Sequence, residues 1–316
     1  MRSLALFTLL WSFSVNSLAD TDADRYPESE LYSKPVEVVP GVWSSIGATQ
    51  PPTYENAGHN NNLSFVISND GVLVVNAGAS YLLAQALHQE ITKITDQPVR
   101  YVVLENGQGH AMLGSNYWRK QGAKIIAHDD AIAEIEKHGV DELDGMKGYN
   151  KERGLDTTIV MPDMSFSERA TLQLGDIPVE LIYFGPAHSA GDISVYLPKQ
   201  DVIIAGDMAF HQRMLPVFPE TETLKWVETF DLFVATGAKH VIPGHGEPTD
   251  MATVTLETKG YLLYLQDEAR KLLDDDLGLD EAYQIDQSAY RHLDTFEELA
   301  TKNAGRIFQE LEMNSF

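Results

Sequence analysis

The chain has 316 residues, of which 47 are acidic, 23 are basic and ten are histidine, and its formal charge is −24. The sequence has no cysteine, which excludes disulfides, thiolate metal sites, iron–sulfur clusters and a cysteine nucleophile. The acidic surplus argues against nucleic acid and anionic membrane surfaces as partners, while the 43% hydrophobic content is typical of a globular chain.

Residues 1–19 have the composition of a secretory signal peptide. Arg2 precedes an apolar run of about a dozen residues, and Ser17 and Ala19 provide small side chains for cleavage near Ala19. Because a membrane-spanning helix needs ~20 apolar residues, we expect no stable membrane insertion. We predict a periplasmic or secreted protein whose mature chain opens with a polar arm over residues 20–35.

Residues 36–128 alternate between short apolar strands and helical patterns. The predicted strands are 36–46 (two strands joined by a turn at Pro40-Gly41), 63–67, 72–75, 99–104 and 125–127. The predicted helices are 79–94 and 115–121. The continuously apolar strand at 72–75 suits a sheet that is covered on both faces. This alternation predicts a layered α/β architecture.

A second set of strands follows a polar helical region at residues 129–153. These strands are predicted over 171–174, 179–184, 193–197, 202–205 and 240–242, with a helix over 222–236. From Met251 onward the pattern is helical, with a break near Asp274-Asp275-Asp276 and Gly278 and a last helix over 295–311. We predict one domain over 36–250 and a helical extension over 251–316, which either caps the sheet or forms a homodimer.

Three loops after short buried strands each hold one metal-binding side chain among small residues. They read Phe184-Gly185-Pro186-Ala187-His188-Ser189-Ala190-Gly191-Asp192, Ala205-Gly206-Asp207-Met208 and Ile242-Pro243-Gly244-His245-Gly246. The ends of strands are where α/β sheets usually place their sites. A single loop histidine is more often a surface residue than a ligand, but three such loops together indicate a metal site built from histidine and carboxylate.

In this order the three loops resemble the later metal-binding loops of the metallo-β-lactamase superfamily, and the likeness extends from about Val36 to Pro248. The resemblance implies an α/β fold, a four-layer αββα sandwich with the helical C-terminal extension added. It also implies that His188 is a ligand of a first metal, that Asp207 bridges two metals and that His245 is a ligand of the second. Residues 94–103 and the last helix further resemble a branch of exported hydrolases linked to quinoprotein and sulfur-oxidation systems.

The family's first metal-binding loop, Thr-His-x-His-x-Asp-His, has no full counterpart in residues 104–111. An ungapped alignment on Gly114 puts Asn106 and Gln108 at the two first-metal histidine positions and His110 at the aspartate position. A shifted alignment makes His110 the last histidine and puts Glu105, Gly107 and Gly109 in the other ligand positions. We favour the ungapped alignment, and under either one most first-metal ligands are missing.

A second departure lies before the first long helix. Asn76 stands where the family usually has an aspartate near the metal loop. A carboxylate that orients ligand histidines loses its role once those histidines are absent. The two departures together predict a remodelled site. Arg213 is noted as a local positive charge on a loop that could face a substrate.

We predict that His110, His188, Asp207 and His245 converge on a single ion, Zn²⁺ with Fe or Mn as alternatives. Such an ion would lower the pKa of water toward ~7, Asp207 would orient that water, and Asn106 or Gln108 would donate to the developing oxyanion. The expected activity is metal-dependent hydrolysis of a small ester, thioester or lactam-like substrate. The alternative is a metal-free, inactive protein of this fold that serves as a periplasmic binding or interaction module.

Overall fold

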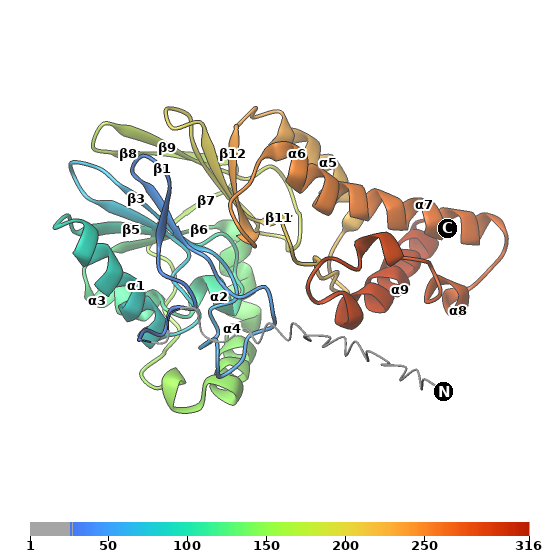
Figure 1. The fold of residues 1–316 in the computed structure, drawn as a ribbon, viewed down its shortest axis with the longest axis horizontal. Coiled ribbons are helices and arrows are strands. Elements are labelled where there is room, and N and C mark those ends of the chain that lie inside the picture. Colours follow the sequence, from blue (N-terminus) through green and yellow to red (C-terminus); the bar gives the residue numbers. More distant parts are fainter. Residues whose placement is uncertain (1–25, 27, 316) are drawn as a thin grey trace, which may run out of the picture.

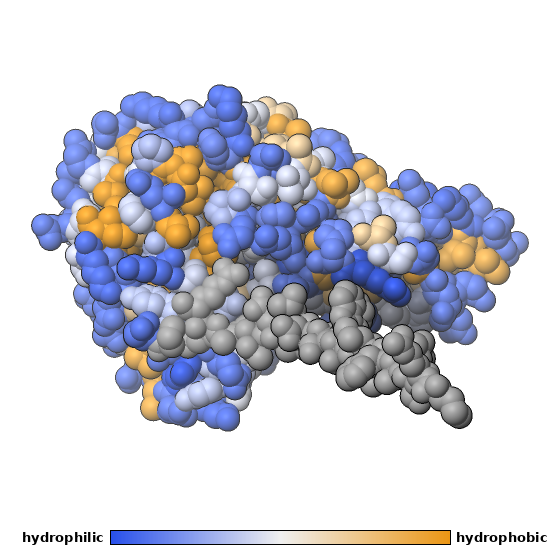
Figure 2. All heavy atoms as spheres, viewed as in Figure 1, coloured by the Kyte–Doolittle hydropathy of each residue, from blue (hydrophilic) through white to orange (hydrophobic). Residues whose placement is uncertain are grey.

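The computed structural model describes Tyr26 and residues 28–315 of the chain. The predicted signal peptide at 1–19 lies outside the described residues. In the described part, no helix has both the length and the hydropathy that crossing a bilayer requires. Two sheets pack face to face with helices on both outer faces, and the C-terminal helices extend beyond the sandwich (Figure 1). Hydrophilic side chains cover much of the face drawn in Figure 2.

The first sheet has seven strands in sequential order and contains every strand predicted between residues 36 and 128. Its strands are β1 (Val36–Val39), β2 (Val42–Ser45), β3 (Leu63–Ile67), β4 (Val72–Val75), β5 (Val99–Val103), β6 (Lys124–His128) and β7 (Met164–Phe166). Pairing is antiparallel as far as β4 and parallel from β4 to β7. The edge strand β7 was not predicted, because its three residues, Met-Ser-Phe, are too few to show a strand pattern and are largely exposed.

Helices that follow β4, β5 and β6 cover the outer face of this sheet. They are α1 (Tyr81–Ile94), α2 (Gly109–Met112), α3 (Ser115–Lys120) and α4 (Asp129–Asn150), and a 3₁₀ turn (Lys151–Gly154) follows α4. α1 begins where the Ser80 hydroxyl accepts a hydrogen bond from the amide of Leu83 at 3.1 Å. Leu83 and Trp118 are fully buried against the sheet together with Phe65.

The second sheet has five strands in the order β12-β11-β10-β9-β8. Its strands are β8 (Arg169–Leu174), β9 (Ile177–Ile182), β10 (Ser194–Leu197), β11 (Val202–Phe210) and β12 (His240–His245), and α5 (Thr223–Val234) lies between the last two. Only the β11–β12 pair is parallel. β11 and β12 continue beyond the ends predicted at Ala205 and Ile242, because register shifts around Gly206 let the pairing resume.

The C-terminal extension packs on the outer face of the second sheet. It consists of α6 (Met251–Val254), a π-helical turn (Thr255–Gly260), α7 (Tyr261–Asp274), α8 (Leu279–Ala282), a 3₁₀ turn (Ser288–Tyr290) and α9 (Phe296–Asn314). Tyr261, Leu265 and Phe308 are at most 1% exposed and lie in one apolar cluster with Trp226 and Phe230 of α5. Of the two roles predicted for this extension, capping the sheet is confirmed, and a homodimer stays a prediction.

Three apolar layers define the architecture. One lies between the first sheet and its helices, the second between the two sheets, and the third between the second sheet and α5 with the C-terminal helices. The layer between the sheets includes Val75, Val103, Val195 and Ile204. The predicted four-layer αββα sandwich with a helical extension is therefore confirmed.

Candidate metal centre

A cleft of about 550 Å³ opens over the ends of β5, β11 and β12. Its floor includes the four side chains predicted as metal ligands, His110, His188, Asp207 and His245. One wall is a continuous face of α4, and the opposite wall is the segment that joins β11 to α5. The structure therefore brings all four predicted ligands together, although they are as many as 135 positions apart along the chain.

Asp207 lies at the centre of this group and is 1% exposed. Its Oδ2 lies 3.5 Å from Nε2 of His110 and 4.0 Å from Nε2 of His188. Its Oδ1 lies 3.3 Å from Nε2 of His245. Each imidazole thus presents the same ring nitrogen to one carboxylate.

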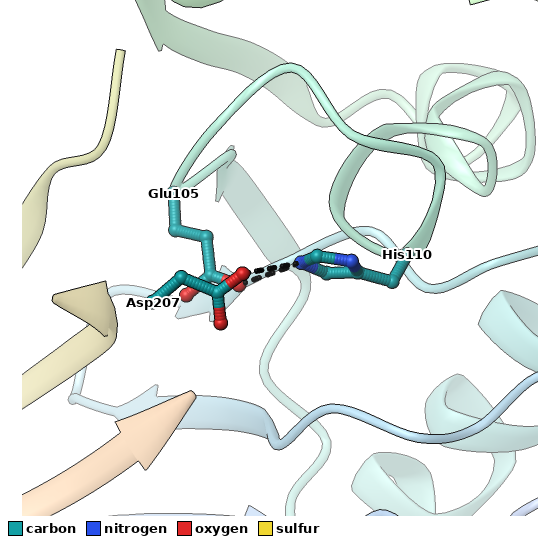
Figure 3. A group of neighbouring side chains, drawn as sticks. All are labelled: Glu105, His110 and Asp207. Atoms are coloured by element: carbon teal, nitrogen blue, oxygen red, sulfur yellow. Dashed lines mark hydrogen bonds and ion pairs between the residues drawn. The ribbon is translucent and has the colours of Figure 1, made fainter. Parts of the chain in front are cut away.

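Glu105 is a further member of the group that the preferred alignment left without a role. Its Oε1 lies 3.1 Å from Nε2 of His110, and ligand atoms of Glu105, His110 and Asp207 lie within 4.8 Å of one another (Figure 3). The signal that could have identified it is a carboxylate immediately after a buried strand. The amide of Glu105 donates to Oδ1 of Asn76 at 3.1 Å, so the residue at the unusual position 76 holds this strand end.

Two backbone carbonyls set the tautomers of His188 and His245. Nδ1 of His188 lies 3.2 Å from the carbonyl oxygen of Pro216, and Nδ1 of His245 lies 2.5 Å from that of Asn60. Because a carbonyl only accepts, each Nδ1 carries the proton and each Nε2 faces Asp207 with a lone pair. At His245 the 2.5 Å contact with the Asn60 carbonyl outweighs the 3.3 Å contact of the same Nδ1 with Nη1 of Arg213. His245 also stacks on Phe210 at 5.1 Å between ring centroids, which fixes its plane.

The buried charges of the group shift its pKa values in opposite directions. Burial would raise the pKa of Asp207, but His245 and His110 outweigh burial and hold it well below its usual range. Burial, together with the Arg213 charge, lowers the pKa of His245 to about 4. Burial would also lower the pKa of His110, but Asp207 and Glu105 raise it to about 9. Burial and the Asp207 charge raise the pKa of Glu105.

The donor set fits a divalent cation. Within the described part of the chain, the buried atoms Oδ1 of Asp207 and Oε2 of Glu105 have no hydrogen-bond partner. Oδ1 of Asp207 also faces the unprotonated Nε2 of His245, so two lone pairs oppose each other at 3.3 Å. Such a contact is unfavourable unless a cation or a proton lies between the atoms. Imidazole nitrogens with carboxylate oxygens are the donors that Zn²⁺, Fe and Mn accept.

Asn106 lies beneath the cleft and is fully buried. Its Nδ2 donates to Oδ1 of Asp192 at 3.0 Å and to Oδ2 of Asp207 at 3.4 Å, and its Oδ1 accepts from the amide of Gln108. Both amide hydrogens are therefore engaged, and Asn106 is placed to orient Asp207 rather than to donate to a substrate oxygen. Gln108, the other predicted donor, lines the cleft.

α4 lines the cleft with the acidic residues Glu134, Asp141 and Glu142. Glu134 accepts from the amide of Gly107 at 3.2 Å, and Glu142 accepts from the amide of Gly109 at 3.1 Å. These two carboxylates hold the glycine-containing loop that leads to His110.

Arg213 lines the opposite wall and is 8% exposed. Its Nη1 donates to the carbonyl of Gln50 at 3.3 Å, and its Nε has no partner among the described residues.

The sequence model of the metallo-beta-lactamase superfamily matches residues 110–245 of the chain. Among curated proteins, the metallo-beta-lactamase type 2 of Bacteroides fragilis is 22% identical over 194 residues, which are 58% of this chain and 70% of that protein. The probable metallo-hydrolase YqgX of Bacillus subtilis (strain 168) is 24% identical over 195 residues, which are 61% of this chain and 88% of that protein.

Solved structures share the fold. A metallo-beta-lactamase from Pontibacter korlensis matches with a TM-score of 0.60 at 18% identity, over 72% of this chain and 98% of that one. The DIM-1 metallo-beta-lactamase matches with a TM-score of 0.58 at 17% identity, over 73% of this chain and 96% of that one. At these identities the likeness concerns the fold, so the chemistry has to be argued from the site itself.

Proposed function

Because the chain belongs to the metallo-β-lactamase superfamily, we propose that it is a metal-dependent hydrolase with a single-ion site. Glu105, His110 and Asp207, whose ligand atoms lie within 4.8 Å of one another, would form the core of the site. His188 and His245 would be its remaining imidazole ligands. The observation that carries this proposal is that two buried carboxylate oxygens, Oδ1 of Asp207 and Oε2 of Glu105, have no hydrogen-bond partner among the described residues. Zn²⁺ is the first candidate, and Fe or Mn are alternatives.

A bound divalent cation would supply Lewis-acid polarisation of a substrate carbonyl and would lower the pKa of water toward ~7. The residues of the chain supply orientation. Asp207 accepts a hydrogen bond from Asn106 and lies beside three imidazoles, so its carboxylate is held in place and can accept a hydrogen bond from a nucleophilic water. Gln108 lines the cleft and can donate to an oxyanion that develops on the substrate.

The charge of the cleft bears on the substrate. Its described lining includes the carboxylates of Glu134, Asp141, Glu142 and Glu220, and Arg213 is the one lysine or arginine among them. A chain with a formal charge of −24 also repels anions at long range. A small neutral or cationic ester, thioester or lactam-like molecule is therefore favoured over an anionic one.

We further propose that the protein acts after export to the periplasm or the medium, on the strength of the signal-like residues 1–19. Membership in the branch of exported hydrolases linked to quinoprotein and sulfur-oxidation systems is part of the same proposal. Cell fractionation with an antibody against the mature chain tests the location. Accumulation of the uncleaved chain in the cytoplasm would contradict it.

Metal analysis of the purified mature protein tests the function, with His245→Ala as the matched variant. We expect close to one equivalent of metal in the wild type, a large loss in the variant, and metal-dependent hydrolysis of neutral esters or thioesters by the wild type alone. Substoichiometric metal that His245→Ala does not change would contradict the proposal. That outcome would favour the inactive binding module, which the replacement of two ligand positions by Asn106 and Gln108 also supports.

A further inference from the structure

The segment of residues 211–218, here termed the strap, forms one wall of the cleft. Its Arg213, Pro216 and Phe218 line the cleft, and the Phe218 ring lies 4.9 Å from the ring of His188. The strap makes no regular pairing beyond an isolated bridge to Asp294. Its conformation therefore depends on the elements that pack behind it.

The C-terminal extension holds the strap along its length. Glu257 accepts from the amide of Gln212 at 2.9 Å, and the carbonyl of Asp294 accepts from the amide of Met214 at 2.9 Å. Arg306 of α9 donates to the carbonyl of Val217. The extension thus contacts the wall of the cleft as well as the outer face of the sheet.

Asn303 of α9 binds the part of the strap that contacts His188. It is fully buried, its Nδ2 donates to the carbonyl of Leu215 at 2.8 Å, and its Oδ1 accepts from the amide of Val217 at 2.9 Å. Nδ2 also donates to the hydroxyl of Tyr261 at 3.1 Å. Asn303 therefore bonds to the strap through the two residues that flank Pro216, the carbonyl of Leu215 and the amide of Val217.

The amide N–H of Val217 and the carbonyl of Pro216 belong to one planar peptide group. In a trans peptide these two groups point in opposite directions, so the plane is fixed when both are bonded. On one side the N–H donates to Asn303, and on the other side the carbonyl accepts from Nδ1 of His188 at 3.2 Å. A single peptide plane therefore links α9 to a histidine of the cleft floor.

We propose that Asn303 is a positioning residue for His188. By fixing the Pro216–Val217 peptide, it keeps the proton of His188 on Nδ1 and leaves the Nε2 lone pair directed at Asp207. The proposal rests on the proposed function only where the Nε2 lone pair is said to bind a metal. The tautomer of His188 is a property of the metal-free protein.

The test is two-bond ¹H–¹⁵N correlation NMR of the full-length mature chain, labelled with ¹⁵N-histidine and free of metal. We expect His188 to be the Nδ1-protonated tautomer in the wild type and a mixture of tautomers in Asn303→Leu. We also expect Zn²⁺ affinity, measured by chelator competition, to fall 10- to 100-fold, as is usual when the partner of a ligand histidine is lost.

Glu310→Ala is the matched control on the same helix. Glu310 accepts from the amides of Thr223 and Leu224 at the start of α5, and among the residues that the structure describes its side-chain hydrogen bonds are to α5 and not to the strap. The Glu310→Ala variant should therefore have a lower melting temperature than the wild type and the same His188 tautomer. Asn303→Asp keeps an oxygen for the Val217 amide and should keep the wild-type tautomer.

An unchanged His188 tautomer in folded Asn303→Leu would overturn the proposal. If Asn303→Leu does not fold, the wild type still decides, because an Nε2-protonated His188 or a Val217 amide without protection from hydrogen exchange would also overturn it. A shifted tautomer with no Zn²⁺ binding by the wild type would support the positioning role and contradict the proposed function instead.

Discussion

Glu105 and Gly206 lie against each other where the first sheet meets the second, and a β-carbon on residue 206 would lie 2.2 Å from Oε2 of Glu105. Gly206 also has a φ of +61°, a conformation that other L-residues rarely adopt. Glycine at this position therefore has two effects. It allows the positive φ in β11, and it leaves space for the buried carboxylate of Glu105 beside the metal-binding group.

Gly206→Ala should destabilise the protein by about 2–4 kcal/mol, of which ~1 comes from the positive φ and the rest from displacement of Glu105. Urea denaturation measures this change. Gly122→Ala is the control, because its φ is +91° and an added β-carbon meets nothing within 4 Å. An equal loss of unfolding free energy in the two variants would show that displacing Glu105 does not contribute to the destabilisation.

Glu105→Gln should weaken metal binding by at least tenfold. The change removes the charge of a carboxylate that is 1% exposed and whose Oε2 has no hydrogen-bond partner in the described part of the chain. Isothermal titration with Zn²⁺ measures the affinity. Glu220→Gln removes a charge from the cleft wall instead of its floor and is the matched control. If both variants bind Zn²⁺ equally well, Glu105 is no ligand.

The sequence predicted most elements of the sandwich because their strands have a continuous or alternating apolar pattern and their helices have apolar residues at helical spacing. It also predicted the convergence of His188, Asp207 and His245, because strand ends gather at one edge of a sheet. The edge strand β7 was not predicted, since three residues, two of them exposed, are too few to show such a pattern.

Glu105 and Asn303 could not be assigned from the sequence, because their roles depend on contacts between distant segments. Glu105 enters the metal-binding group only because Gly206, 101 positions later, lacks a side chain. Asn303 reaches His188 only through the Pro216–Val217 peptide. Asn106 was expected to face the substrate, but burial and its bonds to Asp192 and Asp207 direct its amide inward.

Asp141→Lys should raise kcat/KM for an ester with a carboxylate group several-fold relative to a neutral ester, because it reverses one charge on the acidic wall of the cleft. The gain should diminish as salt concentration rises. Steady-state kinetics at two ionic strengths measure both effects. Asp144→Lys makes the same charge change on α4 away from the cleft lining, and an equal gain there would assign the effect to net charge alone.

Deletion of residues 251–316 should prevent cooperative folding. The deletion uncovers the sheet face and α5 residues that Tyr261, Leu262 and Phe308 bury, and these three side chains are at most 1% exposed. We expect an aggregated product without a near-UV circular dichroism signal. Size-exclusion chromatography of the deletion and the intact chain is the measurement. A folded monomeric deletion beside a dimeric intact chain would instead favour the extension as a dimerisation element.

Glu257→Gln tests the link between the π-helical turn and the strap through its pH dependence. Oε2 of Glu257 lies 2.8 Å from Nδ1 of His211 and accepts from the amide of Gln212. Burial would raise the pKa of Glu257, but these two contacts lower it below the ordinary value of 4.5. Because the pKa is lower in the folded state, the stabilisation is present above pH 4.5 and is lost as the pH falls through the folded-state pKa.

The variant cannot ionise at this position, so it should be less stable than the wild type by about 1 kcal/mol near neutral pH. This deficit should shrink as the pH falls below 4.5, because the wild type then loses the same charge. Urea denaturation over a pH series measures the difference, with Glu312→Gln, an exposed change at the end of α9, as the control for removing one carboxylate. A deficit that stays constant across the series would mean that Glu257 holds the strap by packing and neutral hydrogen bonds, and that its charge contributes nothing.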